Sequence, residues 1–114
     1  MAITDIIKEC LSKGINVKGV TLVNGELAYD IDGFSKSDYA RLYEENGKLY
    51  LETRYKQIDE IETFENIASV AYEWNKGYCT REPFGWDIHW LPIFEEYGWI
   101  EAQDIKQTII KPKR

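Results

Sequence analysis

The sequence predicts an α+β fold: an antiparallel sheet built from two hairpins plus a C-terminal strand, with an N-terminal helix and two C-terminal helices. Apolar residues alternate with a period of two around Asn24-Gly25 and around Asn46-Gly47, and Asn-Gly pairs favour type I′ hairpin turns. Helical spacing appears before residue 14 and after residue 63. A chain of 114 residues is expected to form a single domain over residues 1–114.

The first two elements are a short helix and a long strand. Thr4 or Asp5 is expected to cap the helix, and Gly14 is expected to end it. The strand then runs from Ile15, with Gly19 indicating a bulge, and returns through a two-residue turn at Asn24-Gly25.

A two-residue turn at Asn46-Gly47 sets the register of the second hairpin. It opposes Glu45 and Lys48, Tyr43 and Tyr50, Leu42 and Leu51, and Arg41 and Glu52, which predicts two ion pairs, an aromatic pair and an aliphatic pair. The face predicted to be buried carries Ala40, Leu42, Leu49, Leu51 and Tyr55. The opposite face, wet and aromatic, carries Tyr39, Arg41, Tyr43, Tyr50, Glu52 and Arg54.

The last third is predicted to be mostly helical. Thr63 caps a helix that ends at Gly77, with an inner face of Phe64, Ile67, Ala68, Ala71 and Trp74. An aromatic loop covers residues 77–86, and Asp87 starts a helix over residues 88–97 with Pro92 near its first turn. The final strand is expected over residues 105–111.

Charge and cysteine content narrow the function classes. The net charge of −6 and a pI near 4.8 argue against DNA binding. Cys10 and Cys79 lie 69 residues apart and match no metal-binding spacing, which favours two reduced, buried thiols. The N-terminus has no apolar run long enough for a signal peptide or a membrane span, so a cytoplasmic location is expected.

No legible catalytic constellation appears. His89 is the one histidine, and Cys79 would be its nearest candidate partner in the chain. A lone histidine at a helix start is more often a polar surface residue. Zinc-ligand spacing and phosphate-binding glycine motifs are absent from the sequence. The sequence therefore predicts a binding protein that is not an enzyme and holds neither a metal nor a cofactor.

Recognition of a flat, phosphorylated ligand is the chemistry that the aromatic residues favour. The wet sheet face offers candidates to stack on a base and pair with phosphate: Tyr39, Tyr43, Tyr50, Arg41 and Arg54. The loop aromatics Tyr78, Phe84 and Trp86, together with Arg81, offer the same chemistry. Two other readings stay open: these groups form an ordinary solvated face and complete the core, or they form a homo-oligomer interface.

The second half resembles a known family in its layout. Arg54-Tyr55 ends a hairpin, an acidic stretch leads to a helix with Tyr72-Glu73-Trp74, and an aromatic loop precedes His89-Trp90-Leu91-Pro92 and Tyr97-Gly98-Trp99. This arrangement, over roughly residues 40–111, resembles the small phage anti-Thoeris sponge proteins of the first described type.

The resemblance implies a non-enzymatic anti-defence function. Such proteins sequester a cyclised ADP-ribose immune signal in the bacterial cytoplasm, form homo-oligomers with pockets at subunit interfaces, and in some cases also hold cyclic oligonucleotides. The matching pocket positions here are Arg54, Phe84, His89 (beside the helix residue Trp90) and Lys106, with Tyr78 as a rival to Phe84. His89 stands where an amide is expected and Lys106 where arginine is expected, which leaves the ligand's linkage isomer open.

The alternative function is an acidic protein–protein inhibitor or interaction module of the anti-CRISPR type. The runs Glu44-Glu45, Asp59-Glu60 and Glu95-Glu96 would then dock on a basic partner, with no small-molecule pocket. An enzyme acting on a nucleotide would need His89 close to Cys79, or a carboxylate pair in a cleft.

Overall fold

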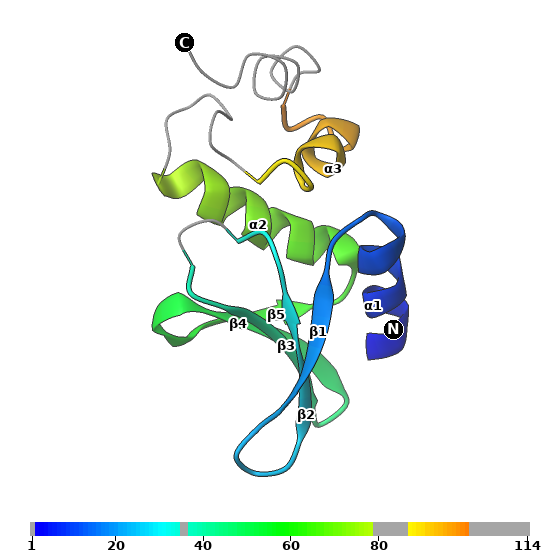
Figure 1. The fold of residues 1–114 in the computed structure, drawn as a ribbon, viewed down its shortest axis with the longest axis vertical. Helices are drawn as coiled ribbons and strands as arrows, with labels where there is room; N and C mark the ends of the chain where they lie inside the picture. Colours follow the sequence, from blue (N-terminus) through cyan, green and yellow to red (C-terminus); the bar gives the residue numbers. More distant parts are fainter. Residues whose placement is uncertain (1, 35–36, 79–86, 101–114) are drawn as a thin grey trace.

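The computed structural model describes residues 2–34, 37–78 and 87–100, and it has the predicted α+β class (Figure 1). An N-terminal helix precedes a five-stranded antiparallel sheet, and two helices follow the sheet. The elements are α1 (Ile3–Ser12), β1 (Val17–Thr21), β2 (Leu27–Ile31), β3 (Ala40–Glu45), β4 (Lys48–Thr53), the 3₁₀ turn η1 (Arg54–Lys56), β5 (Gln57–Ile61), α2 (Phe64–Tyr78) and α3 (Leu91–Glu96).

The strands follow one another across the sheet in chain order, β1-β2-β3-β4-β5. The fifth strand was not predicted, and the strand predicted over residues 105–111 lies outside the described residues. The apolar residues of β5 do not alternate regularly, so its sequence does not indicate a strand. Ile58 lies opposite Glu52 on the wet face and is exposed, whereas Ile61 lies opposite Leu49 in the core. This segment therefore forms a strand because it pairs with β4, since the alternation in its own sequence is weak.

The two Asn-Gly hairpins differ. Asn46 and Gly47 both have positive φ, 55° and 79°, and the register of β3 and β4 is the one predicted. The first hairpin instead has a three-residue loop, because the Leu22 N–H donates to the Glu26 carbonyl (2.8 Å) and Gly25 alone of the loop residues has positive φ. The predicted bulge is also wrong, since Gly19 pairs with Tyr29 within a continuous ladder.

The ion pairs expected within the second hairpin form with other strands. Arg41 Nε donates to Asp30 Oδ1 on β2 at 2.9 Å, rather than pairing with Glu52. Lys48 Nζ lies 3.9 Å from Glu60 Oε2 on β5, rather than pairing with Glu45. The flanking strands supply partners that the hairpin sequence does not contain.

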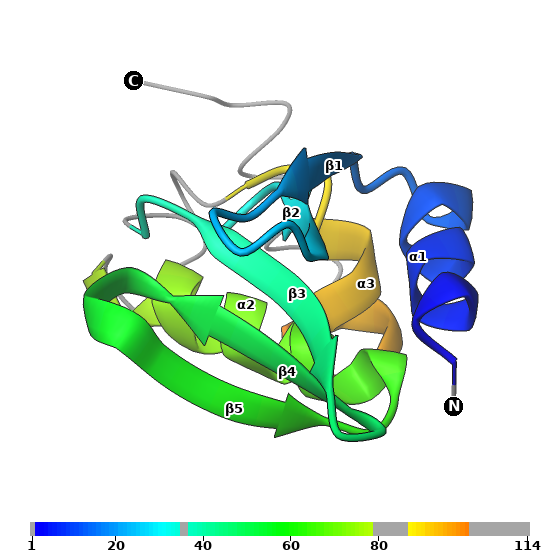
Figure 2. The ribbon, with the colours of Figure 1, turned by 90° about the horizontal axis from the view of Figure 1, so that it is seen from below.

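The helices cover one face of the sheet, with α2 lying across it and α1 beside β1 (Figure 2). Leu42 and Leu51 of the sheet are fully buried, as predicted, and so is the predicted inner face of α2: Phe64, Ile67, Ala68, Ala71 and Trp74. Tyr55 was predicted to be in the core, which is wrong: it is 79% exposed. The chain turns away from the sheet at η1, so the alternation of β4 does not extend to it.

Helix ends differ from the predictions by a few residues. Helix α1 begins at Ile3 after Ala2, with no side-chain cap, so Thr4 and Asp5 lie inside it. Helix α2 begins after Thr63, and Asn66 Oδ1 accepts the Thr63 N–H at 2.9 Å. Helix α3 begins at Leu91 rather than at residue 88, because residues 87–90 form a turn in which Asp87 Oδ1 accepts the His89 N–H at 2.8 Å.

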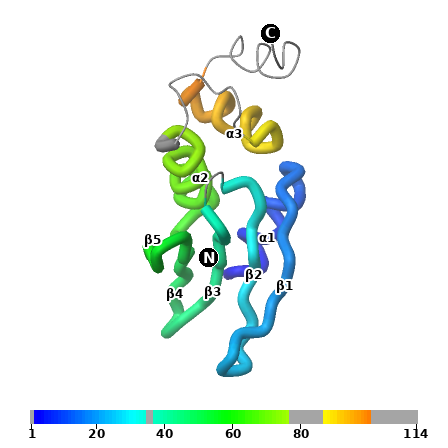
Figure 3. The backbone as a smooth tube through the Cα atoms, turned by 60° about the vertical axis from the view of Figure 1, so that its left-hand side comes forward, coloured from blue at the N-terminus to red at the C-terminus, as the bar shows by residue number. Residues whose placement is uncertain are grey.

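Trp90 is the centre of an aromatic cluster beneath α3. Its ring stacks on Phe64 and Phe94, with centroid distances of 5.7 and 5.8 Å, and meets the edge of Phe34 at 5.9 Å. Its Nε1–H donates to the Asp32 carbonyl at 2.8 Å. Figure 3 shows how α3 and α2 lie one above the other at this end of the sheet. The cluster joins the C-terminal helices to the end of β2.

Cys10 is buried, and its protection can be measured. Burial, together with the negative charge of Glu9, raises the pKa of the Cys10 thiol from 9.0 to about 12. We expect Cys10 to resist a thiol reagent at pH 8 in a Cys79→Ser background and to react at once in urea. As the pH rises, the thiol of the unfolded chain loses its proton at a lower pH than the buried thiol does. The free energy of unfolding should therefore fall as the pH rises above about 9. Rapid labelling of the native protein would contradict this expectation.

Within the described ranges, no helix is both long and apolar enough to cross a membrane.

Candidate functional site

Two parts of the structure gather polar and aromatic groups: a turn at one end of the sheet and a cavity beside α3. The turn consists of Arg54, Tyr55 and Lys56 between β4 and β5, and we call it the Arg54 turn. Figures 1 and 2 place it at the same end of the molecule as the C-terminal end of α2. Tyr55 and Lys56 have φ of 65° and 57°, a left-handed conformation that costs energy in residues other than glycine.

Hydrogen bonds from the sheet hold the Arg54 turn. The Arg54 N–H donates to Ser37 Oγ at 3.1 Å, and the Ser37 hydroxyl donates to the Tyr39 carbonyl at 2.7 Å. At the other end of the turn, the buried Thr53 hydroxyl donates to the Gln57 carbonyl at 3.4 Å. These contacts keep the left-handed backbone and its exposed side chains in one place.

The Arg54 turn presents an aromatic ring and two cationic residues. Arg54 Cζ lies 5.2 Å from the centroid of the Tyr55 ring, and Lys56, the next residue, is exposed. Arg54 Nε lies 3.5 Å from Asp38 Oδ2, and the Asp38 side chain is 71% exposed. An ion pair to a carboxylate this exposed contributes at most about 1 kcal/mol, so a phosphate can compete with Asp38 for Arg54.

The wet sheet face carries Arg41 and Tyr50, both predicted to bind ligand. Arg41 is bonded to Asp30, which raises the pKa of Arg41, and its guanidinium lies 5.5 Å from the Tyr39 ring centroid. Tyr50 packs on Tyr43 with a centroid distance of 5.8 Å. Partial burial and the nearby Glu52 raise the pKa of Tyr43. The side chains of this face therefore contact one another, and the guanidinium of Arg41 is already paired with the Asp30 carboxylate.

The remaining predicted residues are dispersed. Trp90 is fully buried, so its ring has no surface that a ligand could reach in this chain. Tyr78 is the last residue of α2. Phe84 and Lys106 lie outside the described residues. His89 lies in the turn before α3, in the cavity described next, and Arg54 does not line that cavity.

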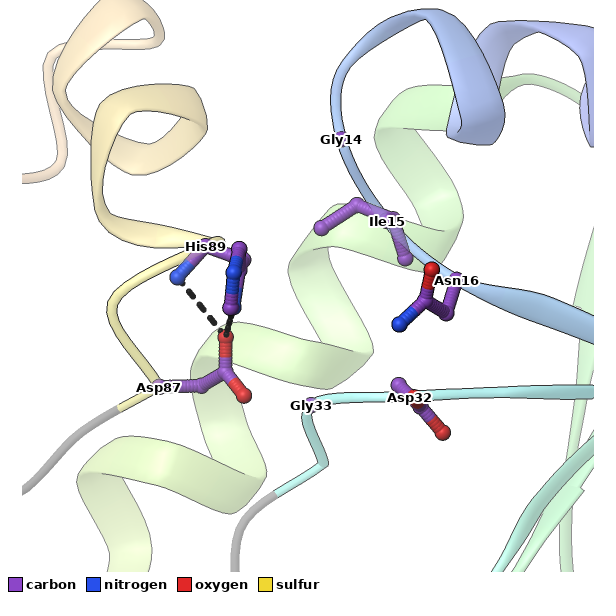
Figure 4. Close-up of a pocket in the computed structure, with 7 residues that line it drawn as sticks. All are labelled: Gly14, Ile15, Asn16, Asp32, Gly33, Asp87 and His89. Carbon is purple, nitrogen blue, oxygen red and sulfur yellow. Dashed lines mark hydrogen bonds and ion pairs between the residues drawn. The ribbon is translucent and has the colours of Figure 1, made fainter.

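The cavity has a volume of about 210 Å³ and lies where three segments meet (Figure 4). It is lined by Gly14, Ile15, Asn16, Asp32, Gly33, Asp87 and His89. We call it the Asp87 cavity. Figure 4 shows Asp87 and His89 on one wall and Ile15 and Asn16 on the opposite wall. His89 Nδ1 lies 3.5 Å from Asp87 Oδ1.

The walls of the Asp87 cavity are tied together by buried groups. Asn75, fully buried on α2, donates from Nδ2 to the Gly33 carbonyl at 3.1 Å and accepts the Asp87 N–H at 3.1 Å. Trp90 holds the Asp32 carbonyl, and the Asp32 N–H donates to the Asn16 carbonyl at 3.1 Å. The cavity is therefore preformed rather than a gap between independent loops.

Sequence reasoning missed the exposure of Tyr55 and the pairing of Asp32 with Asp87 around a cavity. The first had no local signal, because Arg54, Tyr55 and Lys56 continue the polar-apolar alternation of β4, and only the turn η1 exposes Tyr55. The second had a signal only for one pair: the predicted first hairpin brings residues 16 and 32 together, whereas residue 87 joins them through the buried Asn75 and Trp90.

In the part of the chain that the structure describes, no three His, Cys, Asp or Glu side chains are grouped to hold a metal ion. Comparisons with protein-family models, curated proteins and solved structures found no match to this chain.

Proposed function

We propose that this protein is a phage-type anti-defence sponge that binds a cyclic nucleotide immune signal, of the cyclised ADP-ribose type, and withholds it without cleaving it. The observation that carries the proposal is the Arg54 turn. It displays a tyrosine ring that is 79% exposed, with a guanidinium 5.2 Å from the ring centroid and a lysine next to it.

Each group of the Arg54 turn suits one part of such a ligand. A base stacked on the Tyr55 ring gains about 1–3 kcal/mol. A charge-assisted hydrogen bond from Arg54 to a phosphate adds about 1.5–3 kcal/mol. Ser37 and Thr53 hold the turn before the ligand arrives, so less ordering entropy is lost on binding.

The ligand needs more surface than this turn offers. The resemblance to sponge proteins supports a homo-oligomer in which a second copy covers the Arg54 turn and completes the pocket. The C-terminal end of α2 lies at the same end of the molecule as the Arg54 turn, so it is a candidate for that contact. The proposed place of action is the cytoplasm of the bacterial host. His89 and its acidic surroundings are not needed for this proposal.

The test is to incubate the purified protein with cyclised ADP-ribose isomers and cyclic oligonucleotides, remove the protein-bound fraction, denature it by heat, and identify what is released. We expect intact ligand to be released from the wild-type protein. Arg54→Ala and Tyr55→Ala should each weaken capture about tenfold or more, because each removes at least about 1.4 kcal/mol of binding free energy.

Lys18→Ala is the matched control, since Lys18 is an exposed cation on β1, at the opposite edge of the sheet from β5. It should capture ligand like the wild type. Conversion of the ligand would show an enzyme instead. No capture of any cyclic nucleotide would favour the acidic interaction module, whose surface would include the exposed Glu44, Glu45, Glu60 and Glu62 at the other end of the strands.

A further inference from the structure

We infer that the Asp87 cavity is a second binding site, and that it takes a small aliphatic amine carrying two ammonium groups. This site is separate from the Arg54 turn, and the inference does not depend on the proposed function. It follows from the space in the cavity, the rigidity of its walls and the charge of its lining.

The cavity is a built space. Its volume of about 210 Å³ is smaller than the roughly 300–1,000 Å³ of pockets for drug-sized ligands, so it suits a molecule with a four-carbon chain. Asn75 holds the backbone of Gly33 and Asp87, Trp90 holds the Asp32 carbonyl, and the Asp32 N–H holds the Asn16 carbonyl. A ligand would therefore meet groups that are already in position.

The charge of the lining decides the class of ligand. Asp32 and Asp87 contribute two carboxylates, and none of the seven lining residues is Lys or Arg. An anion would be repelled there, and the net charge of −6 adds to that repulsion. Cationic ammonium groups are attracted for the same reasons.

Acceptor capacity remains at both carboxylates. Asp87 accepts the His89 N–H through Oδ1, and a carboxylate has about four acceptor positions. Asp32 makes its contacts to Trp90 and Asn16 through its backbone, and the residue is exposed. Asp87 can thus accept from one ammonium group and the exposed Asp32 from the other, while Ile15, only 1% exposed, closes the opposite wall.

The test uses three ligands of equal chain length and different charge: putrescine, 1,4-butanediol and succinate. His89 is the single histidine of the chain, so its imidazole resonances in NMR report on the cavity without ambiguity. At pH 8 and constant ionic strength, we expect putrescine to shift these resonances in a saturable way and the other two to leave them unchanged.

Charge-removing variants test whether putrescine binds in the Asp87 cavity. Asp32→Asn and Asp87→Asn keep the shape of the side chain and remove one charge, and each should weaken putrescine binding about tenfold or more. Asp5→Asn on α1 removes the same charge outside the cavity and should change the affinity less than twofold. An equal shift with butanediol, a shift with succinate, no saturable shift with putrescine, or unchanged affinity in both cavity variants would each overturn the inference.

Discussion

Gly33→Ala is expected to destabilise the fold by about 3–5 kcal/mol, a large part of the roughly 5–15 kcal/mol that keeps a domain folded. A Cβ at this position would lie 2.3 Å from Cδ1 and 2.4 Å from Nε1 of Trp90, where carbon atoms normally stay about 3.5–4.0 Å apart. The indole cannot move aside, because Phe64 and Phe94 pack on its faces. A φ of 94° adds strain for alanine.

Gly25→Ala is the matched control. Gly25 has nearly the same φ, 90°, but an added Cβ there meets no atom within 4 Å. It should cost only the left-handed strain of about 1–2 kcal/mol. Urea denaturation followed by far-ultraviolet circular dichroism measures both variants. Equal losses in the two would show that Trp90 does not require a glycine beside it.

Trp90→Ala is expected to cost about 3–5 kcal/mol, the usual range for a fully buried aromatic residue. The loss combines the apolar surface shared with Phe34, Phe64 and Phe94 and the hydrogen bond to the Asp32 carbonyl. Because Trp90 links β2 to α3, the variant should also lose the near-ultraviolet signal of ordered aromatic rings.

Trp90→Phe separates the two contributions if the alanine variant does not fold. It keeps an aromatic ring but leaves the partly buried Asp32 carbonyl without its indole donor, so we expect a loss of about 1–3 kcal/mol. Tyr55→Ala, which removes an exposed ring, should change stability by less than about 0.5 kcal/mol. A Trp90→Ala protein as stable as the Tyr55 variant would contradict the central place given to Trp90.

These two predictions bear on the candidate sites as well as on stability. Gly33 lines the Asp87 cavity and Trp90 packs against Gly33, so loss of this packing should remove the cavity before it removes the sheet. The Arg54 turn is anchored through Ser37 and Thr53, which belong to a different part of the structure.

The sequence alone determined the α+β class, the register of the β3–β4 hairpin and the buried face of α2, because each rests on local backbone preference or on a short apolar period. It predicted Arg54 as a candidate contact, although whether Arg54 binds a ligand stays a prediction. The tertiary structure decided what depends on partners far away in the chain. Arg41 pairs with Asp30 across strands, β5 forms against β4, and the turn after Thr53 exposes Tyr55. The Asp87 cavity exists because Asn75 and Trp90 hold residue 87 beside the end of β2, and no local pattern records these contacts between residues so distant in sequence.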